Sequence, residues 1–268
     1  MSLRIAHLSD IHFGGEEKAA VASAVAELAS FAPDLTVVSG DLTLNGLPEE
    51  FVAAHDWLRR LPTPLLVTPG NHDTPYWNLF LRALTPFDRY QHYIGPARWS
   101  AYDGPGVSAR ALNSARGAQA RLDWSKGAID GSRLSQLNWM EAAPLKLLTC
   151  HHPLIDPPGA PVGGRTRGGP AAARRLAAQH VELVLTGHVH VPFAMPLPGG
   201  AGPCYALGAG TLSVRTRGAP PSFSTITVQA DAFEVVVRGW VDGGFQAGEA
   251  QRLPRGDGGA IHSKANPL

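Results

Sequence analysis

The sequence predicts an α/β fold, and three observations support this prediction. In the first half of the chain, short apolar runs typical of buried strands alternate with longer stretches of helical spacing. Five of the apolar runs are each followed by a cluster of polar residues. After Val191 the pattern changes to short strand-like segments broken by Gly and Pro. The alternation indicates right-handed βαβ units and a largely parallel sheet, and the later segments indicate an antiparallel second sheet or the far edge of the first.

Prolines delimit the helices of the first half. Pro48 suits the first turn of a helix, and Pro62 and Pro64 end that helix before the next strand. The elements expected here are, in chain order, strand Leu3–Leu8, helix Glu16–Phe31, strand Leu35–Val38, helix Glu49–Leu61 and strand Leu65–Val67.

The stretch Tyr76–Trp99 is rich in aromatic residues and is expected to be helical. Packing in the core is the first interpretation of its aromatic side chains. The stretch could instead cover one side of a site, or form the contact face of a homodimer.

Two further helix–strand units follow, and the rest of the chain is expected to be strand-rich. The expected elements are helix Ser132–Ala142, strand Leu145–Cys150, helix Pro170–His180, strand Glu182–Thr186, and the strands Cys204–Leu207, Thr211–Arg215, Phe223–Val228 and Ala232–Val241. Gln251–Leu268 is polar and rich in Gly and Pro, which predicts a loosely held tail. We expect one domain over residues 1–250, followed by this tail over residues 251–268.

The composition is typical of a soluble globular protein, with 44% hydrophobic and 17% charged residues among 268. A net charge of +1 gives no reason to expect nucleic acid or an anionic membrane as a partner. Cys150 and Cys204 lie in strand-like runs and are expected to be buried free thiols. No apolar stretch approaches the roughly 20 residues of a membrane helix. A signal peptide would have to contain Asp10 and His12, so a cytoplasmic location is expected.

The five polar clusters consist of residue types that bind metals. They are Asp10-Ile11-His12, Gly40-Asp41, Gly70-Asn71-His72-Asp73, His151-His152-Pro153 and Gly187-His188-Val189-His190. Because strand ends converge at one edge of an α/β sheet, these side chains are expected to meet. In an extended segment, side chains at i and i+2 point the same way, so the pairs Asp10/His12 and His188/His190 suit shared ions. The glycines permit a positive φ and a close turn before the ligand.

Seven of these side chains would form a two-metal site. They are Asp10, His12, Asp41, Asn71, His151, His188 and His190. If one carboxylate bridges, each metal receives four protein contacts, with room for a shared hydroxide. Two divalent ions, two carboxylates and a hydroxide leave about one positive charge, which favours a small phosphate-ester substrate. The nitrogen and oxygen ligands, without sulfur, favour Mn, Fe, Zn or Co over Mg or Ca.

The five motifs together resemble the calcineurin-like metallophosphoesterase family, over residues 3 to about 220. The run Gly40–Gly46, with Glu49-Glu50-Phe51 and Trp57-Leu58, resembles the branch called class III cyclic nucleotide phosphodiesterases. The resemblance implies a four-layer α-β-β-α sandwich, in which two packed mixed β-sheets are flanked by helices. It also implies a phosphodiesterase acting on small phosphodiesters such as 3′,5′-cyclic nucleotides, by attack of a metal-bridging hydroxide on phosphorus.

The resemblance also implies a role for each motif residue, with Asp41 bridging the two metals. The implied ligand sets are Asp10, His12, Asp41 and His190 for one metal and Asp41, Asn71, His151 and His188 for the other. His72 would lie beside the phosphate and stabilise charge or protonate the leaving oxygen. Asp73 would orient His72.

The residues that select the substrate are less well defined by the sequence. The Gly/Pro-rich stretch Asp156–Gly169 could form a lid over the site. The candidate substrate-binding side chains are Arg116, Arg165, Arg167, Arg215, Arg217 and His152. Arginines can clamp a phosphate through two hydrogen bonds, but each could equally be a surface charge, and His152 could be structural.

Two other functions remain open. A lipid-linked pyrophosphate or phosphodiester hydrolase at a membrane surface would need an amphipathic cap, and Tyr76–Trp99 is the only candidate. A metal-free binding scaffold would show substituted ligand positions, which this sequence lacks. A nuclease is disfavoured because the sequence has no basic stripe with interleaved aromatic residues.

Overall fold

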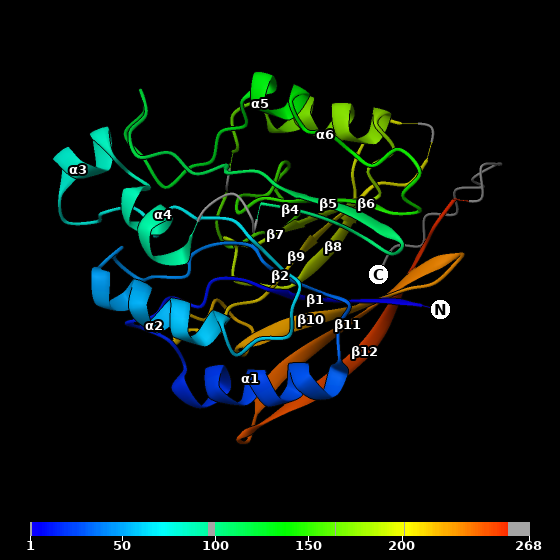
Figure 1. Cartoon of the computed structure of the whole chain (residues 1–268), viewed down its shortest axis with the longest axis horizontal. Coiled ribbons are helices and arrows are strands. Elements are labelled where there is room, and N and C mark those ends of the chain that lie inside the picture. The colour runs from blue at the N-terminus through cyan, green and yellow to red at the C-terminus, as the bar shows by residue number, and fades with distance from the viewer. Residues whose placement is uncertain (1, 96–99, 164, 201, 257–268) are drawn as a thin grey trace.

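The computed structural model describes residues 2–95, 100–163, 165–200 and 202–256. These residues form four layers, because two mixed sheets pack face to face and helices cover the outer face of each (Figure 1). In the view of Figure 1, α1 (Lys18–Phe31) and α2 (Pro48–Leu58) lie below the sheets, and α5 (Gly131–Ser135) and α6 (Gly169–Ala178) lie above them. The predicted α-β-β-α sandwich is confirmed.

The first sheet has the strand order β12-β11-β10-β1-β2-β3. Its strands are β1 (Leu3–Leu8), β2 (Leu35–Val38), β3 (Leu65–Val67), β10 (Ser222–Val228), β11 (Ala232–Val241) and β12 (Gly244–Pro254). The strands β1, β2 and β3 are parallel, whereas β10, β11 and β12 pair antiparallel. The strands β10 to β12 therefore extend the first sheet, which was one of the two predicted arrangements. The expected antiparallel strand Cys204–Leu207 instead pairs parallel with Leu183–Thr186 in the second sheet, so that part of the prediction is wrong.

The second sheet has the order β4-β5-β6-β7-β9-β8. Its strands are β4 (Ala101–Gly104), β5 (Val107–Ala111), β6 (Lys146–Thr149), β7 (Leu183–Thr186), β8 (Phe193–Pro196) and β9 (Tyr205–Gly208). Four of them are parallel, and β4 and β8 run antiparallel at the two edges. The expectation that all the motif-bearing strands share one sheet is wrong, since β1, β2 and β3 belong to one sheet and β6 and β7 to the other.

Three hydrophobic cores lie between the four layers. Alternate residues of β1 serve two of them, because Ile5 faces the second sheet while Ala6 and Leu8 face α1 and α2. The third core lies between the second sheet and α6, and contains Leu148 and Leu176. Burial of both sheet faces explains why these strands are continuous apolar runs.

Three predicted elements differ from the structure. Helix Ser132–Ala142 stops at Ser135, because the Asn138 carbonyl accepts a hydrogen bond from Arg110 Nε and Met140 N donates to Ser108 Oγ. Thr211–Arg215 is a loop with one isolated bridge, instead of a strand. The predicted tail begins inside β12, which runs to Pro254, and residues 257–268 lie outside the described residues.

The aromatic stretch Tyr76–Trp99 forms two short helices, α3 (Leu79–Leu84) and α4 (Asp88–Ile94), instead of one continuous helical segment. Pro86 separates them, because a proline cannot donate the helical hydrogen bond. Tyr90 of α4 is buried in the core, whereas Trp77 and Phe80 are 74% and 72% exposed. The core-packing prediction therefore holds for α4 alone. Residues 96–99 of the stretch lie outside the described residues, and the homodimer stays a prediction.

Candidate metal centre

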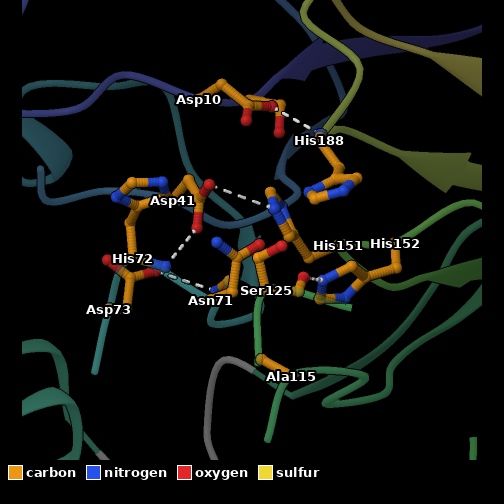
Figure 2. A network of polar contacts seen from close by, with 12 residues as sticks. Asp10, Asp41, Asn71, His72, Asp73, Ala115, Ser125, His151, His152 and His188 are labelled. Carbon is orange, nitrogen blue, oxygen red and sulfur yellow. Dashed lines mark hydrogen bonds and ion pairs between the residues drawn. The ribbon is translucent and has the colours of Figure 1, made fainter. Parts of the chain in front are cut away.

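The five polar clusters meet where the carboxyl ends of strands from both sheets approach each other (Figure 2). Asp10, Asp41 and Asn71 come from the first sheet, and His151 and His188 from the second. All seven predicted ligands are buried, with at most 6% of each residue exposed. Side chains far apart in the chain are thus brought into one enclosed polar cluster.

The backbone around these side chains is left-handed at most ligand positions. Positive φ angles occur at Asp10 (54°), His12 (51°), Asp41 (52°), His188 (70°) and His190 (61°). The i, i+2 pairs are therefore not extended, as their spacing suggested, and His188 and His190 belong to different groups of ligand atoms. Such conformations cost about 1–3 kcal/mol each for non-glycine residues and are concentrated at functional sites.

At two positions of the clusters only glycine fits, because a neighbouring side chain lies too close for a Cβ. The reason there is not a positive φ. A Cβ at Gly70 would lie 2.1 Å from Asp41 Oδ1, and a Cβ at Gly187 would lie 2.3 Å from Asp10 Oδ2. Only Gly40, with φ of 92°, takes the left-handed turn that the sequence predicted for these glycines. The carboxylates of Asp41 and Asp10 therefore pack directly against the backbone of Gly70 and Gly187, which fixes their position.

Three histidines are oriented by backbone carbonyls. His12 Nδ1 lies 3.3 Å from the Thr43 carbonyl, His151 Nδ1 2.8 Å from the Ser39 carbonyl, and His190 Nδ1 2.7 Å from the Arg215 carbonyl. A carbonyl only accepts, so each Nδ1 carries a proton, and Nε2 is the atom that offers a lone pair when the ring is neutral. This second contact is the usual way in which a metal-binding histidine is held in one tautomer.

The Nε2 lone pairs converge on positions that a cation would satisfy. His12 Nε2 and His190 Nε2 lie 3.2 Å apart, and His190 Nε2 lies 3.1 Å from Asp10 Oδ1. Two acceptor nitrogens this close repel each other unless a cation lies beside both. Asp10, His12 and His190 form one group whose ligand atoms lie within 4.8 Å of one another.

A second group of ligand atoms lies beside the first. His151 Nε2 is 3.2 Å from Asp41 Oδ2, and Asp10, Asp41 and His151 also form a group within 4.8 Å. Four buried atoms here make no hydrogen bond. They are Asp10 Oδ1, Asn71 Oδ1, His151 Nε2 and His188 Nε2. Buried polar atoms are rarely left unpaired, so this donor set fits bound metal ions.

The charge states of the cluster also suit cation binding. Burial alone would raise the pKa of the Asp41 carboxyl, but His151 and His72 hold that pKa well below its usual value. Burial lowers the pKa of His151, yet Asp41 and Asp10 outweigh it and raise that pKa to about 9. A cation between these groups would replace the proton on His151, since metals bind the neutral imidazole.

His72 lies beside the cluster, but Asp73 does not orient it directly. His72 Nδ1 is 2.6 Å from the Leu44 carbonyl. Asp73 accepts hydrogen bonds from the backbone of Leu42, Thr43 and Gly70 and from the Thr43 hydroxyl. Asp73 is buried beneath the loops and is linked to His72 only through the Thr43 hydroxyl, which also donates to the His72 carbonyl, so the orienting role of Asp73 stays a prediction.

His152 is buried beside His151 and His188, and both of its ring nitrogens have hydrogen-bond partners. Its Nδ1 lies 2.9 Å from Ser114 Oγ, and its Nε2 lies 2.8 Å from the Ser125 carbonyl. Both ring nitrogens are occupied and the residue is 0% exposed. The predicted substrate contact is not supported, and the structural alternative describes His152 better.

The structure divides the five candidate arginines. Arg215 reaches the cluster, with Nη1 at 3.2 Å from His72 Nε2, and Arg217 Nη1 donates to the His188 carbonyl at 3.4 Å. Arg116 instead donates to the carbonyls of its own loop, while Arg165 and Arg167 are exposed.

The stretch Asp156–Gly169 pairs with the segment after Ser125 instead of lining the space beside His72. Arg167 N donates to the Gly127 carbonyl and Ile129 N donates to the Arg167 carbonyl. Gly164 lies outside the described residues. The role of this stretch as a lid stays a prediction.

The sequence analysis missed a sixth strand end. Strand β5 is followed by Asn113-Ser114, and Ser114 binds His152. Its signal was weaker than that of the five clusters, because Val107–Leu112 contains Ser108 and Arg110 and is not a continuous apolar run. The carbonyls of Ser39, Thr43 and Leu44, which orient the histidines, carry no signal because any residue supplies one.

Comparison with known proteins identifies the family. The family model described as calcineurin-like phosphoesterase matches residues 3–192. The chain belongs to this family. A probable cyclic nucleotide phosphodiesterase of Synechococcus sp. is 30% identical over 211 residues, which cover 72% of this chain and 75% of that protein. The chain is accordingly a hydrolase of phosphoester bonds, as the motifs predicted.

Two further likenesses are more limited. A glycerophosphodiester phosphodiesterase of Enterobacter lignolyticus is 39% identical over 94 residues, covering 31% of this chain and 34% of that protein. A dimetal phosphatase of Danio rerio has a TM-score of 0.63 at 13% identity, covering 95% of this chain and 99% of that one, and shows the shared fold. Within the described residues, the helices are too short or too polar to cross a bilayer.

Proposed function

We propose that this protein is a phosphodiesterase that holds two transition-metal ions and hydrolyses small phosphodiesters. The observation that carries the proposal is the set of buried, unpaired lone pairs facing one another across the two sheets. A binding scaffold without metals would leave these atoms unsatisfied at a cost of about 1–3 kcal/mol each.

The proposed ligand sets follow the two groups of atoms. Asp10, His12, Asp41 and His190 would hold one ion and Asp41, Asn71, His151 and His188 the other, with Mn, Fe, Zn or Co as candidates. When bound, the ions supply a water of lowered pKa and positive charge for the phosphate oxygens. The buried carboxylates keep the net charge low enough for the ions to remain bound and high enough to attract an anion.

The protein's own residues then orient the phosphate and manage the proton. His72 Nδ1 donates its proton to the Leu44 carbonyl, so its Nε2 is the acceptor of the neutral ring and would donate to a leaving oxygen only after taking up a proton itself. Arg215 reaches the same nitrogen and can transfer its donors to an arriving phosphate oxygen. The Ser213 hydroxyl accepts from Arg215 N, which fixes the loop that presents this arginine.

A cyclic nucleotide is the first substrate to test, since the relative with the broadest match is named for that activity. The residues of the class III branch motif have structural contacts here. Glu50 accepts hydrogen bonds from Asn45 N and Leu47 N, and Trp57 Nε1 donates to the Val21 carbonyl. Glu50 therefore fixes the loop after Asp41, whereas Trp57 ties α2 to α1, and neither residue lines the pocket beside His72.

Hydrolysis of a lipid-linked phosphodiester or pyrophosphate is the second candidate. The exposed apolar side chains of Trp77, Leu79, Phe80 and Leu84 favour it, because they lie around helix α3 next to the cluster. Retention on sedimenting vesicles would favour this substrate over a soluble one.

A substrate panel tests the proposal. Cyclic AMP, glycerophosphocholine, bis(p-nitrophenyl) phosphate and p-nitrophenyl phosphate would be assayed with the Mn-loaded protein and with Asp41→Ala. We expect diester hydrolysis by the wild type and at least about a hundredfold less by the variant. Equal background rates in both proteins would overturn the proposal. Hydrolysis of the monoester alone would replace the diesterase by a monoesterase.

A further inference from the structure

A cavity of about 550 Å³ opens directly beside the candidate metal centre. Asn71 and His72 form its inner end, so a molecule inside it would touch the residues that face the phosphate. The outer walls come from two separate parts of the chain. One wall consists of Tyr76, Leu79 and Arg82, and the other of Leu122, Asp123, Trp124 and Ser125. We call this cavity the ester-arm pocket.

The outer walls of the ester-arm pocket carry large apolar side chains that are exposed to water. Leu79 is 60% exposed, Tyr76 is 46% exposed, and Leu122 is fully exposed. Large apolar side chains that line a cavity in contact with water usually mark a binding site. The two opposite charges at the pocket, Arg82 and Asp123, offset each other, so the walls offer no excess charge for a second anion.

Both walls are anchored. Arg82 Nε donates to the Gly117 carbonyl at 3.1 Å, which ties helix α3 to the loop of the opposite wall. Trp124 Nε1 donates to the Gln119 carbonyl at 3.1 Å, which closes that loop on itself. His152 holds the same loop through the Ser125 carbonyl at 2.8 Å. The pocket is therefore preformed, and a ligand would not have to order its walls.

We infer that the ester-arm pocket binds a bulky apolar ester arm of the substrate while the phosphate lies at the metal centre. This inference rests on the proposed function and narrows its substrate class to phosphodiesters with one large alkyl or aryl arm. An arm the size of a methyl group would leave Leu79 and Leu122 in water. A longer arm would cover both side chains and gain their burial on binding.

A series of alkyl and aryl p-nitrophenyl phosphates tests the inference, because all share one leaving group. The methyl, butyl, hexyl and phenyl esters would be compared by kcat/KM, below their aggregation concentrations. Complete burial of one CH2 corresponds to about fourfold, so partial burial predicts at least about a tenfold gain from methyl to hexyl or phenyl. If kcat/KM rises more for the hexyl ester than for the phenyl ester, the pocket prefers an alkyl arm. The opposite order indicates an aryl arm.

Two leucines of the same helix give a matched control. Leu79 lines the pocket, whereas Leu84 does not, and the two are similarly exposed at 60% and 63%. Leu79→Asn should reduce the hexyl-to-methyl ratio of kcat/KM at least about threefold. Leu84→Asn should preserve the ratio.

The outcomes separate this inference from the proposed function. If the wild type hydrolyses every ester at the same kcat/KM, the ester-arm pocket does not select the substrate and the inference is overturned, while the diesterase stands. An equal loss of the ratio in Leu79→Asn and Leu84→Asn would also overturn it. If no ester is hydrolysed above the Asp41→Ala background, the proposed function fails and the inference fails with it.

Discussion

The candidate metal centre and the ester-arm pocket share His72 and Asn71 but are built in opposite ways. In the metal centre every ligand is buried, and three of its histidines are fixed by backbone carbonyls. In the pocket, Leu79 and Leu122 are exposed to water. Buried polar atoms are expensive to change, whereas exposed apolar ones are not. We therefore expect the first region to set the reaction class and the second to select the substrate.

The largest effect is expected from adding a methyl group inside the metal centre. Gly70→Ala places a Cβ 2.1 Å from Asp41 Oδ1 and 2.5 Å from Asp41 N, so the carboxylate must move. We expect at least about a hundredfold loss of kcat/KM, with about 1–3 kcal/mol of destabilisation. Chemical denaturation and kinetics of the Mn-loaded protein measure both.

Gly131→Ala is the control for this prediction, since a Cβ there meets nothing within 4 Å. Its activity should equal that of the wild type. Full activity of Gly70→Ala would show that Asp41 is not held as described.

The second-largest effect is expected at Arg215, which the sequence could not distinguish from Arg165. Arg215→Ala removes the guanidinium beside His72 and should lower kcat/KM for diesters about 10–100-fold. Arg165→Ala removes an exposed charge and should change it less than about twofold. Steady-state kinetics measure both, and equal losses in the two variants would contradict the assignment.

These comparisons show which parts of the site the sequence could predict. The sequence predicted Asp10, Asp41 and His151 as site residues, because each follows an apolar run at a strand end and this pattern is local. The contacts of His152 and Arg215 were not predictable, since Ser125 lies 27 residues and His72 143 residues away along the chain.

The fold shows the same division. Strands β1 to β3 were predicted because both of their faces are buried and the runs are apolar. Helix Ser132–Ala142 was predicted too long, because the tertiary hydrogen bonds of Asn138 and Met140 override a local helical pattern. The division of the parallel strands between two sheets depends on long-range pairing, which short patterns do not specify.

A smaller effect on the kinetics is expected at His152, which lies beside the metal centre and holds the loop of the ester-arm pocket. His152→Ala removes the hydrogen bond to the Ser125 carbonyl, which holds the loop that carries Leu122 and Trp124. It also removes the ring contact of Ser114, whose hydroxyl keeps the hydrogen bond from the backbone N–H of residue 152. We expect KM for the hexyl ester to rise about tenfold and kcat to change little, with about 1–3 kcal/mol of destabilisation. A loss of kcat with unchanged KM would place His152 in the chemistry instead.

The smallest effect is expected at Cys204, which is 2% exposed and belongs to neither region. Burial disfavours its thiolate and raises the pKa of the thiol to about 12. At pH 8 the group is therefore protonated in the folded protein and becomes reactive only on unfolding, when its pKa falls toward the usual value. A disulfide reagent should label Cys204 in denaturant and not in buffer. Rapid labelling of the native protein would contradict this burial.

Elemental analysis of the purified protein after equilibration with micromolar Mn, Fe, Zn or Co measures the cations on which the reaction depends. The geometry predicts two ions per chain in the wild type and fewer in Asn71→Ala and His190→Ala. A wild-type protein that binds none of the four metals would contradict a dinuclear centre.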